Sequence, residues 1–162
     1  EIDFEVIGAS FKEFCHGSDV VLLEGAGGLL VPLGGGERGV DGGEPGAKGG
    51  REGVGAGRGQ TMAHLAVFLG LPLIIVAPSR IGVINHSMLT VRLALQMGLS
   101  ISGIILNHPA LPNPHDSSLA SNRAEVARHT GVPLLGEVPY KETNAPYVDV
   151  RGVVAALTGE GS

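Results

Sequence analysis

The sequence has few cysteines and aromatic residues: among 162 residues it holds one cysteine, Cys15, no tryptophan, and 4% aromatic residues. A single cysteine excludes an internal disulfide framework and a zinc site built from several cysteines. No apolar run approaches the ~20 residues that cross a bilayer, and no charged and then apolar leader opens the chain. We therefore expect a soluble, cytoplasmic protein without a membrane partner.

Positive charge is also scarce, with 11 lysines and arginines against 16 acidic residues and a net charge of −5. Nucleic-acid binding and polybasic membrane anchoring both need clustered cations. The composition therefore predicts no nucleic-acid partner. Because the first residue is Glu1 and not methionine, the sequence also suggests a fragment or a processed chain.

Glycine is abundant, with 27 residues, and it is concentrated between residues 34 and 59, where half of the positions are glycine. Val40 and Val54 are the only large apolar residues of that segment. Such a segment buries too little surface to offset its ordering entropy. We predict a disordered surface insertion at 34–59 within a single domain over 1–162, with a functional lid as the alternative.

Helical apolar spacing and short continuous apolar runs alternate along the rest of the chain. The spacing predicts helices at 2–16, 61–69, 84–97, 118–130 and 146–157. The apolar runs predict buried strands at 20–23, 73–77, 101–106 and 134–138. This alternation indicates an α/β fold in which helices flank a parallel sheet. Ligands of such sheets bind at the carboxyl ends of the strands.

Glycines follow the first predicted strand directly, in the segment Glu24–Gly28. A carboxylate at the end of a buried strand suits a hard cation such as Mg²⁺, which prefers oxygen ligands. Glycines allow a sharp turn that brings backbone N–H groups close to phosphate oxygens. A plain structural turn is the alternative, and Leu30 at the position of the third glycine excludes the dinucleotide-binding fingerprint.

The second and third predicted strands also lead into polar residues. After the second, Gly82 precedes a helix that begins near Ile84, and the free N–H groups of a helix start suit a carboxylate or phosphate. Asn85 extends that site or, alternatively, only caps the first helical turn. At the end of the third, the amide of Asn107 matches the donor and acceptor edge of a base, although a loop asparagine needs no such role.

Five segments, in this order, resemble dethiobiotin synthetase, an ATP-dependent enzyme of biotin synthesis with a P-loop NTPase-like fold: EGAGGLLVPL, TMAHLAVFLGLPLIIVA, IGVINHSMLT, GLSISGIILN and VPLLGEVP. The resemblance covers about residues 19–139. In that family, 7,8-diaminononanoate and CO₂ form a carbamate, which takes the γ-phosphoryl group of ATP and closes to a ureido ring. The resemblance implies ATP and Mg²⁺ as cofactors, these two substrates, and a homodimer.

The resemblance also implies roles for individual residues. Glu24 would hold the Mg²⁺, and Asn107 would contact adenine. The implied nucleotide-binding residues are Glu24, Gly25, Ala26, Gly27, Asn107, His108, Val138, Pro139 and Tyr140. The implied residues of a substrate-carboxylate site, shared across the dimer, are Gly82, Val83, Ile84 and Asn85.

Parts of the family pattern are missing. The family's phosphate-binding loop, catalytic lysine and second Mg²⁺ carboxylate lie upstream of EGAGG, where this sequence has only residues 1–23 and one lysine, Lys12. The stretch 54–61 does not replace the loop, because Gln60 stands where the lysine belongs. His64 stands where the family usually has an aspartate, and we assign it no metal. We expect a sheet without its first strand–loop–helix unit, no catalytic residue in this chain, and a fragment inactive in ring closure.

Two other interpretations stay open. The chain is alternatively a non-catalytic dethiobiotin-synthetase-like domain that binds a nucleotide or a protein partner. It is alternatively a fragment of a cobyrinate-amidating or partition-type ATPase, because the string EGAGG suits those enzymes as well.

Overall fold

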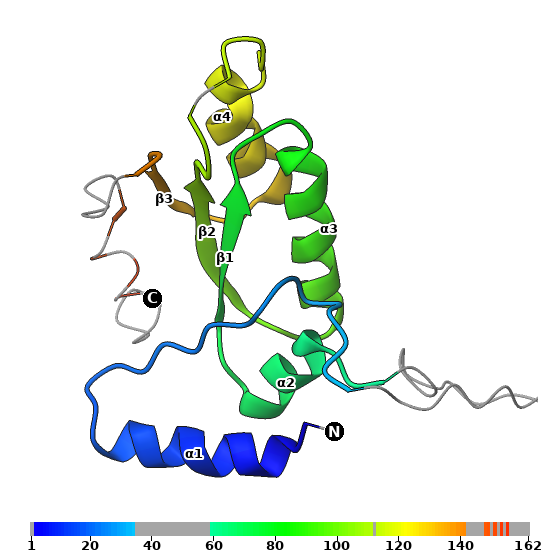
Figure 1. The fold of residues 1–162 in the computed structure, drawn as a ribbon, viewed down its shortest axis with the longest axis vertical. Helices are drawn as coiled ribbons and strands as arrows, with labels where there is room; N and C mark the ends of the chain where they lie inside the picture. Colours follow the sequence, from blue (N-terminus) through cyan, green and yellow to red (C-terminus); the bar gives the residue numbers. More distant parts are fainter. Residues whose placement is uncertain are drawn as a thin grey trace, which may run out of the picture. The chain divides into compact units, whose positions relative to one another are not determined.

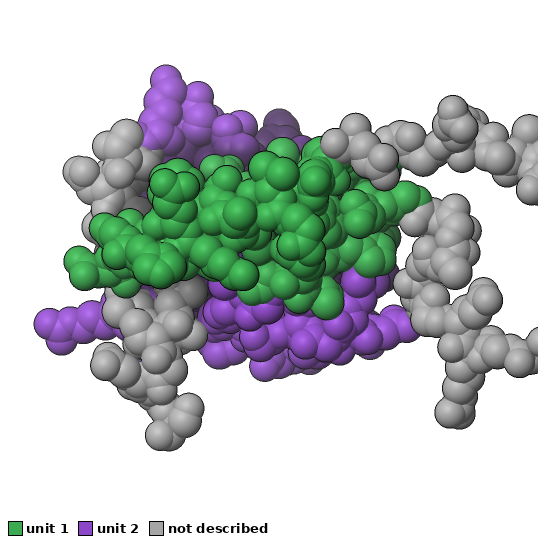
Figure 2. All heavy atoms as spheres, turned by 90° about the horizontal axis from the view of Figure 1, so that it is seen from below, with its two compact units in different colours: residues 1–69 green, residues 70–162 purple. Residues whose placement is uncertain are grey.

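The computed structural model describes residues 2–34, 59–111, 113–141, 148–149, 151, 153 and 155. The chain divides into two compact units, residues 1–69 and residues 70–162, which Figure 2 shows in different colours. The insertion predicted at 34–59 lies almost wholly outside the described residues. Its predicted disorder, and the single domain predicted over the whole chain, stay predictions.

The first unit contains two helices, α1 (Phe4–His16) and α2 (Met62–Leu69). The side chain of Asp3 accepts from the backbone N–H of Glu5 and so caps α1, which ends at Gly17. The rings of Phe4 and Phe68 lie 5.7 Å apart and join the two helices. Both helices confirm the predictions made from apolar spacing.

The strand predicted at Val20–Leu23 is absent, and that prediction is wrong. The segment is irregular, and Leu22 is 73% exposed. A strand needs a neighbour that accepts and donates backbone hydrogen bonds. No described residue pairs with this segment in that way, so apolar composition alone did not produce a strand.

The second unit alternates strand and helix: β1 (Leu73–Pro78), α3 (Val83–Gln96), β2 (Ile101–Asn107), α4 (Leu119–Thr130) and β3 (Leu134–Val138). The strands are parallel and lie in the order β1-β2-β3. Helices α3 and α4 pack against one another and against the sheet, as Figure 1 shows. The predicted parallel sheet with flanking helices is therefore confirmed.

An apolar core fills the space between these helices and the sheet. Its buried members are Ala77, Val83, Val91, Ile104, Leu106 and Val126. They are contributed by two strands and two helices, so the core fixes where each helix begins relative to the strand before it. On β1 the prediction of full burial is wrong at Val76, which is 62% exposed, because successive strand residues point to opposite faces.

The described part of the chain contains no helix that is long and apolar enough to cross a membrane. The helix predicted at 146–157 lies largely outside the described residues, although positions 151, 153 and 155 are helical. The backbone N–H of Val153 donates to the carbonyl of Asp149 at 2.9 Å, the spacing of an α-helical turn.

Candidate functional site

The three strands of the second unit end side by side. Pro78 of β1 pairs with Asn107 of β2, which in turn pairs with Val138 of β3. The segments that follow these strands, which were predicted to bind ligands, therefore begin at the same edge of the sheet. Figure 1 shows the arrowheads of β1 and β2 pointing to the end where α3 and α4 begin. This end is where parallel sheets bind their ligands.

The loop after β1 is held from two directions. The backbone N–H of Ser79 donates to the carbonyl of Asn107 at 2.7 Å, and the amide of Asn122 on α4 donates to the Ser79 hydroxyl at 3.4 Å. The backbone N–H of Ile81 donates to the carboxylate of Asp116 at 3.2 Å. These contacts fix the path of the chain into α3.

Helix α3 starts at Gly82, which has a φ of +93° that side chains rarely adopt. Within the described residues no side-chain hydrogen bond caps this helix, so nothing there supports the alternative that Asn85 only caps the first turn. Within the described residues, no carbonyl accepts from the N–H groups of Ile84 and Asn85. The exposed side chain of Asn85 lies on this first turn, which is suited to an anionic group.

Asp116 stabilises the neighbouring β2–α4 connection as well as the loop after β1. Its carboxylate accepts from the hydroxyl and the backbone N–H of Ser118. The Ser118 hydroxyl, followed by the backbone N–H groups of Ser118 and Ile81, holds the pKa of Asp116 below its ordinary value of 3.8. The charged form of Asp116 is therefore the form that fits this loop.

Asn107 and His108 stand at the end of β2. The backbone N–H of His108 donates to the carbonyl of Val138 at 2.9 Å. Within the described residues, the side-chain amide of Asn107 has no hydrogen-bond partner, so its donor and acceptor are both available. Tyr140 lies two residues after the end of β3, and its ring centroid is 5.3 Å from the ammonium of Lys141.

The ring of His108 contacts a carboxylate that the sequence reasoning missed. Its Nε2 lies 2.8 Å from Oε1 of Glu137, and Oε2 of the same carboxylate lies 3.5 Å from Nη1 of Arg123. The side chains of His108 and Glu137 are 17% and 24% exposed. Glu137 therefore links β3 to the start of the β2–α4 connection and to α4 itself.

In the first unit, residues 24–28 form an irregular turn in which Gly27 has a φ of +86°. The carbonyls of Leu29 and Val31, just after this turn, accept from the first N–H groups of α2. Glu24 is exposed and forms no ion pair with any described residue. The buried strand expected before this carboxylate is not observed, and the role of Glu24 as a metal ligand stays a prediction.

His64 has a structural partner at the start of α2. Its Nδ1 accepts from the backbone N–H of Thr61 at 3.1 Å and lies 2.8 Å from the Thr61 hydroxyl. The contact from the Thr61 N–H is one half of a capping box, in which His64 takes the place of glutamate, while the Thr61 hydroxyl contacts the same ring nitrogen. The described residues contain no group of three or more His, Cys, Asp or Glu side chains that could hold a metal ion.

The sequence is similar to known proteins. A family model described as AAA domain matches residues 46–146. The ATP-dependent dethiobiotin synthetase BioD of Anoxybacillus flavithermus (strain DSM 21510 / WK1) is 38% identical over 122 residues, which is 75% of this chain and 44% of that protein. BioD of Bacillus subtilis (strain 168) is 36% identical over 118 residues, 73% of this chain and 40% of that protein.

The parallel sheet with flanking helices is of the P-loop NTPase-like α/β class. The chain belongs to the AAA domain family and is a dethiobiotin synthetase-like protein, as its sequence segments predicted. It spans less than half the length of the two curated relatives.

Proposed function

We propose that this chain forms part of the active site of a dethiobiotin synthetase, which uses ATP and Mg²⁺ to convert 7,8-diaminononanoate and CO₂ into dethiobiotin. The observation that supports the proposal most strongly is the alignment of Pro78, Asn107 and Val138 at one end of the sheet. In a chain of this family, that end offers one loop for an anionic group and one for a base.

The base of ATP would bind beside β2 and β3. The free amide of Asn107 can donate to a ring nitrogen and accept from the exocyclic amino group of adenine. His108 lies next to it, and Val138, Pro139 and Tyr140 would border the ring. Apolar and aromatic side chains suit the faces of a base, whereas the amide selects its edge.

The carboxylate of 7,8-diaminononanoate would bind at the start of α3. Gly82, Val83, Ile84 and Asn85 form this start, and the N–H groups of Ile84 and Asn85 have no acceptor within the described residues. A helix N-terminus stabilises a negative charge through these N–H groups and the helix dipole. The substrate's far end would thereby be fixed while its amino groups react.

The phosphates and Mg²⁺ would bind at residues 24–27. Mg²⁺ is commonly held by one or two carboxylates together with substrate phosphates and water. The carboxylate of Glu24, which is exposed and forms no ion pair with any described residue, fits a single ligand of this kind. When bound, Mg²⁺ would neutralise the charge of the polyphosphate. The backbone N–H groups of Gly25, Ala26 and Gly27 would also help to neutralise this charge.

The 162-residue sequence holds no G-x-x-x-x-G-K-[ST] loop. The lysine of that loop offsets the charge of the β- and γ-phosphates. We therefore expect this polypeptide by itself to bind ATP without closing the ring. A non-catalytic nucleotide-binding domain would have the same binding behaviour.

The proposed enzyme is a homodimer. Leu89 and Ile81 are 60% and 80% exposed, and Asn85 precedes Leu89 by one turn on the same side of α3. Exposed apolar residues around a substrate-binding side chain suit a second copy of the chain that covers the site.

Two measurements test this function. Calorimetric titration of the 162-residue chain with ATP and Mg²⁺ should show saturable binding, and the absence of binding would contradict the proposal. This polypeptide alone should not incorporate labelled CO₂ into dethiobiotin in the presence of 7,8-diaminononanoate and ATP, and incorporation by it would contradict the expected lack of ring closure.

A further inference from the structure

The carboxylate of Glu137 contacts two basic side chains, those of His108 and Arg123. Oε1 lies 2.8 Å from Nε2 of His108, and Oε2 lies 3.5 Å from Nη1 of Arg123. Both Glu137 and His108 are largely buried, whereas the Arg123 side chain is 57% exposed. The contact with His108 is therefore the shorter and better shielded of the two.

An ionised carboxylate only accepts hydrogen bonds. A neutral His108 ring that contacts Glu137 through Nε2 must therefore carry its proton on Nε2, which leaves Nδ1 as an acceptor. Within the described residues, Nδ1 of His108 has no hydrogen-bond partner. The same arrangement, in which a carboxylate fixes one imidazole nitrogen and frees the other, orients histidines in many functional sites.

His108 is held through its backbone as well as its ring. Its N–H donates to the carbonyl of Val138, while the carbonyl of the preceding Asn107 accepts from Ser79. Backbone and ring contacts together fix the residue next to the proposed adenine-binding amide. A side chain held in this way discriminates between ligands better than a mobile one, because it loses less conformational freedom when a ligand binds.

We propose that Glu137 is a positioning residue that holds the His108 ring as a hydrogen-bond acceptor toward the base of the bound nucleotide. This inference rests on the proposed binding of ATP at the ends of β2 and β3. An acceptor at Nδ1 matches the exocyclic amino group of adenine and opposes the carbonyl oxygen at the equivalent position of guanine. Glu137 therefore contributes to the preference of the site for ATP over GTP.

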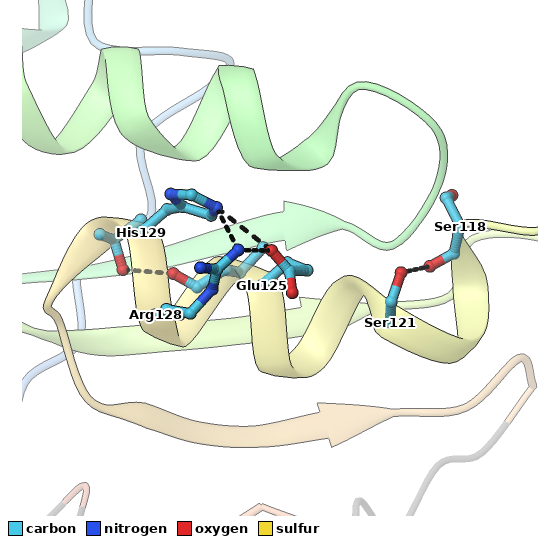
Figure 3. A network of polar contacts seen from close by, with 7 residues as sticks. Ser118, Ser121, Glu125, Arg128 and His129 are labelled. Carbon is cyan, nitrogen blue, oxygen red and sulfur yellow. Dashed lines mark hydrogen bonds and ion pairs between the residues drawn. The ribbon is translucent and has the colours of Figure 1, made fainter.

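The Glu137→Gln variant keeps the size of the side chain, but its amide can also donate a hydrogen bond, so it no longer requires the proton on Nε2. Glu125 provides a matched control on α4, because its carboxylate also contacts an arginine and a histidine. Oε2 of Glu125 lies 2.6 Å from Nη2 of Arg128 and 3.1 Å from Nε2 of His129, as Figure 3 shows. Glu125→Gln thus removes a similar charge from the same unit.

Calorimetric titrations with ATP and with GTP, both with Mg²⁺, measure the effect on the full 162-residue chain. Glu137→Gln should weaken ATP binding about tenfold and bring the ATP-to-GTP affinity ratio close to one. Glu125→Gln should leave both affinities unchanged. A folded Glu137→Gln variant with unchanged ATP affinity and preference would overturn the inference while leaving the proposed function intact. Absence of ATP binding by the unsubstituted chain would overturn the proposed function and the inference together.

Nitrogen NMR of the His108 ring gives a second readout that needs no nucleotide. Recorded at a pH at which the ring is neutral, the spectrum of the unsubstituted chain should show the proton on Nε2, and that of Glu137→Gln should show a mixture of tautomers. A ring protonated on Nδ1 in the unsubstituted chain would overturn the inference even if the variant lost ATP binding through misfolding.

Discussion

The amide of Asn122 donates to the hydroxyl of Ser79 in the interior of the second unit, where the two residues are 1% and 3% exposed. Asn122 belongs to α4 and Ser79 directly follows β1, so one buried contact ties a helix to the loop that leads into α3. The proposed carboxylate site at the start of α3 depends on the position of this loop. The buried hydrogen bond between Asn122 and Ser79 therefore helps to fix the geometry of that site.

Removal of one partner of this buried pair should destabilise the fold. Asn122→Ala leaves the Ser79 hydroxyl without its donor in a buried position, which costs about 1–3 kcal/mol of unfolding free energy. Urea unfolding measures the loss. The double variant Ser79→Ala with Asn122→Ala should lose less than the sum of the two single variants, because neither partner is then left unpaired. Strictly additive losses would contradict the pairing.

The Asp116 carboxylate should make stability depend on acidic pH. Its hydrogen bonds from Ser118 and Ile81 lower its folded-state pKa below 3.8. A lowered pKa contributes stability that is present above the unfolded-state pKa and is lost as the pH falls through the folded-state pKa. Urea midpoints of the unsubstituted chain should therefore exceed those of Asp116→Asn at about pH 7, and the difference should shrink below the unfolded-state pKa. A difference independent of pH would contradict this account.

Asn85 should affect binding and leave stability unchanged. It does not cap α3, and its side chain is exposed, so Asn85→Ala should change the unfolding free energy by less than about 0.5 kcal/mol. Affinity for 7,8-diaminononanoate, measured by calorimetry on the 162-residue chain, should fall because the substrate carboxylate loses a donor. A large loss of stability would show that the Asn85 side chain has a structural role. Unchanged affinity would show that it does not bind the substrate.

Leu89 should belong to the dimer interface. Leu89→Arg would place a charge in a desolvated apolar contact, and sedimentation velocity should then show monomers. Leu95→Arg is the matched control, because Leu95 is similarly exposed, at 59%, but lies six positions further along the helix and thus on another side. Equal behaviour of the two variants would contradict the assignment of this face.

Local patterns in the sequence predicted most of the fold. Apolar spacing located α1, α2, α3 and α4, and continuous apolar runs located the three strands of the sheet, because both signals arise within a few residues. The run at Val20–Leu23 had the same local signal and formed no strand, since pairing requires a partner that composition does not reveal.

The side chains that organise the site could not be found in this way. Glu137 contacts His108 across 29 positions, Asp116 contacts Ile81 across 35, and Asn122 contacts Ser79 across 43. No local spacing carries such pairings. The candidates Asn107 and Asn85 were identifiable because one ends a strand and the other lies on the first turn of the helix after a strand, where the topology of a parallel sheet gathers functional residues.

Titration of the Asn107→Ala variant with ATP and Mg²⁺ measures whether the end of β2 binds the base of ATP. The side-chain amide of Asn107 has no hydrogen-bond partner among the described residues, so its removal should leave the melting temperature unchanged. Loss of its contacts with the base should weaken ATP binding about tenfold. A folded Asn107→Ala variant that binds ATP as tightly as the unsubstituted chain would contradict the account.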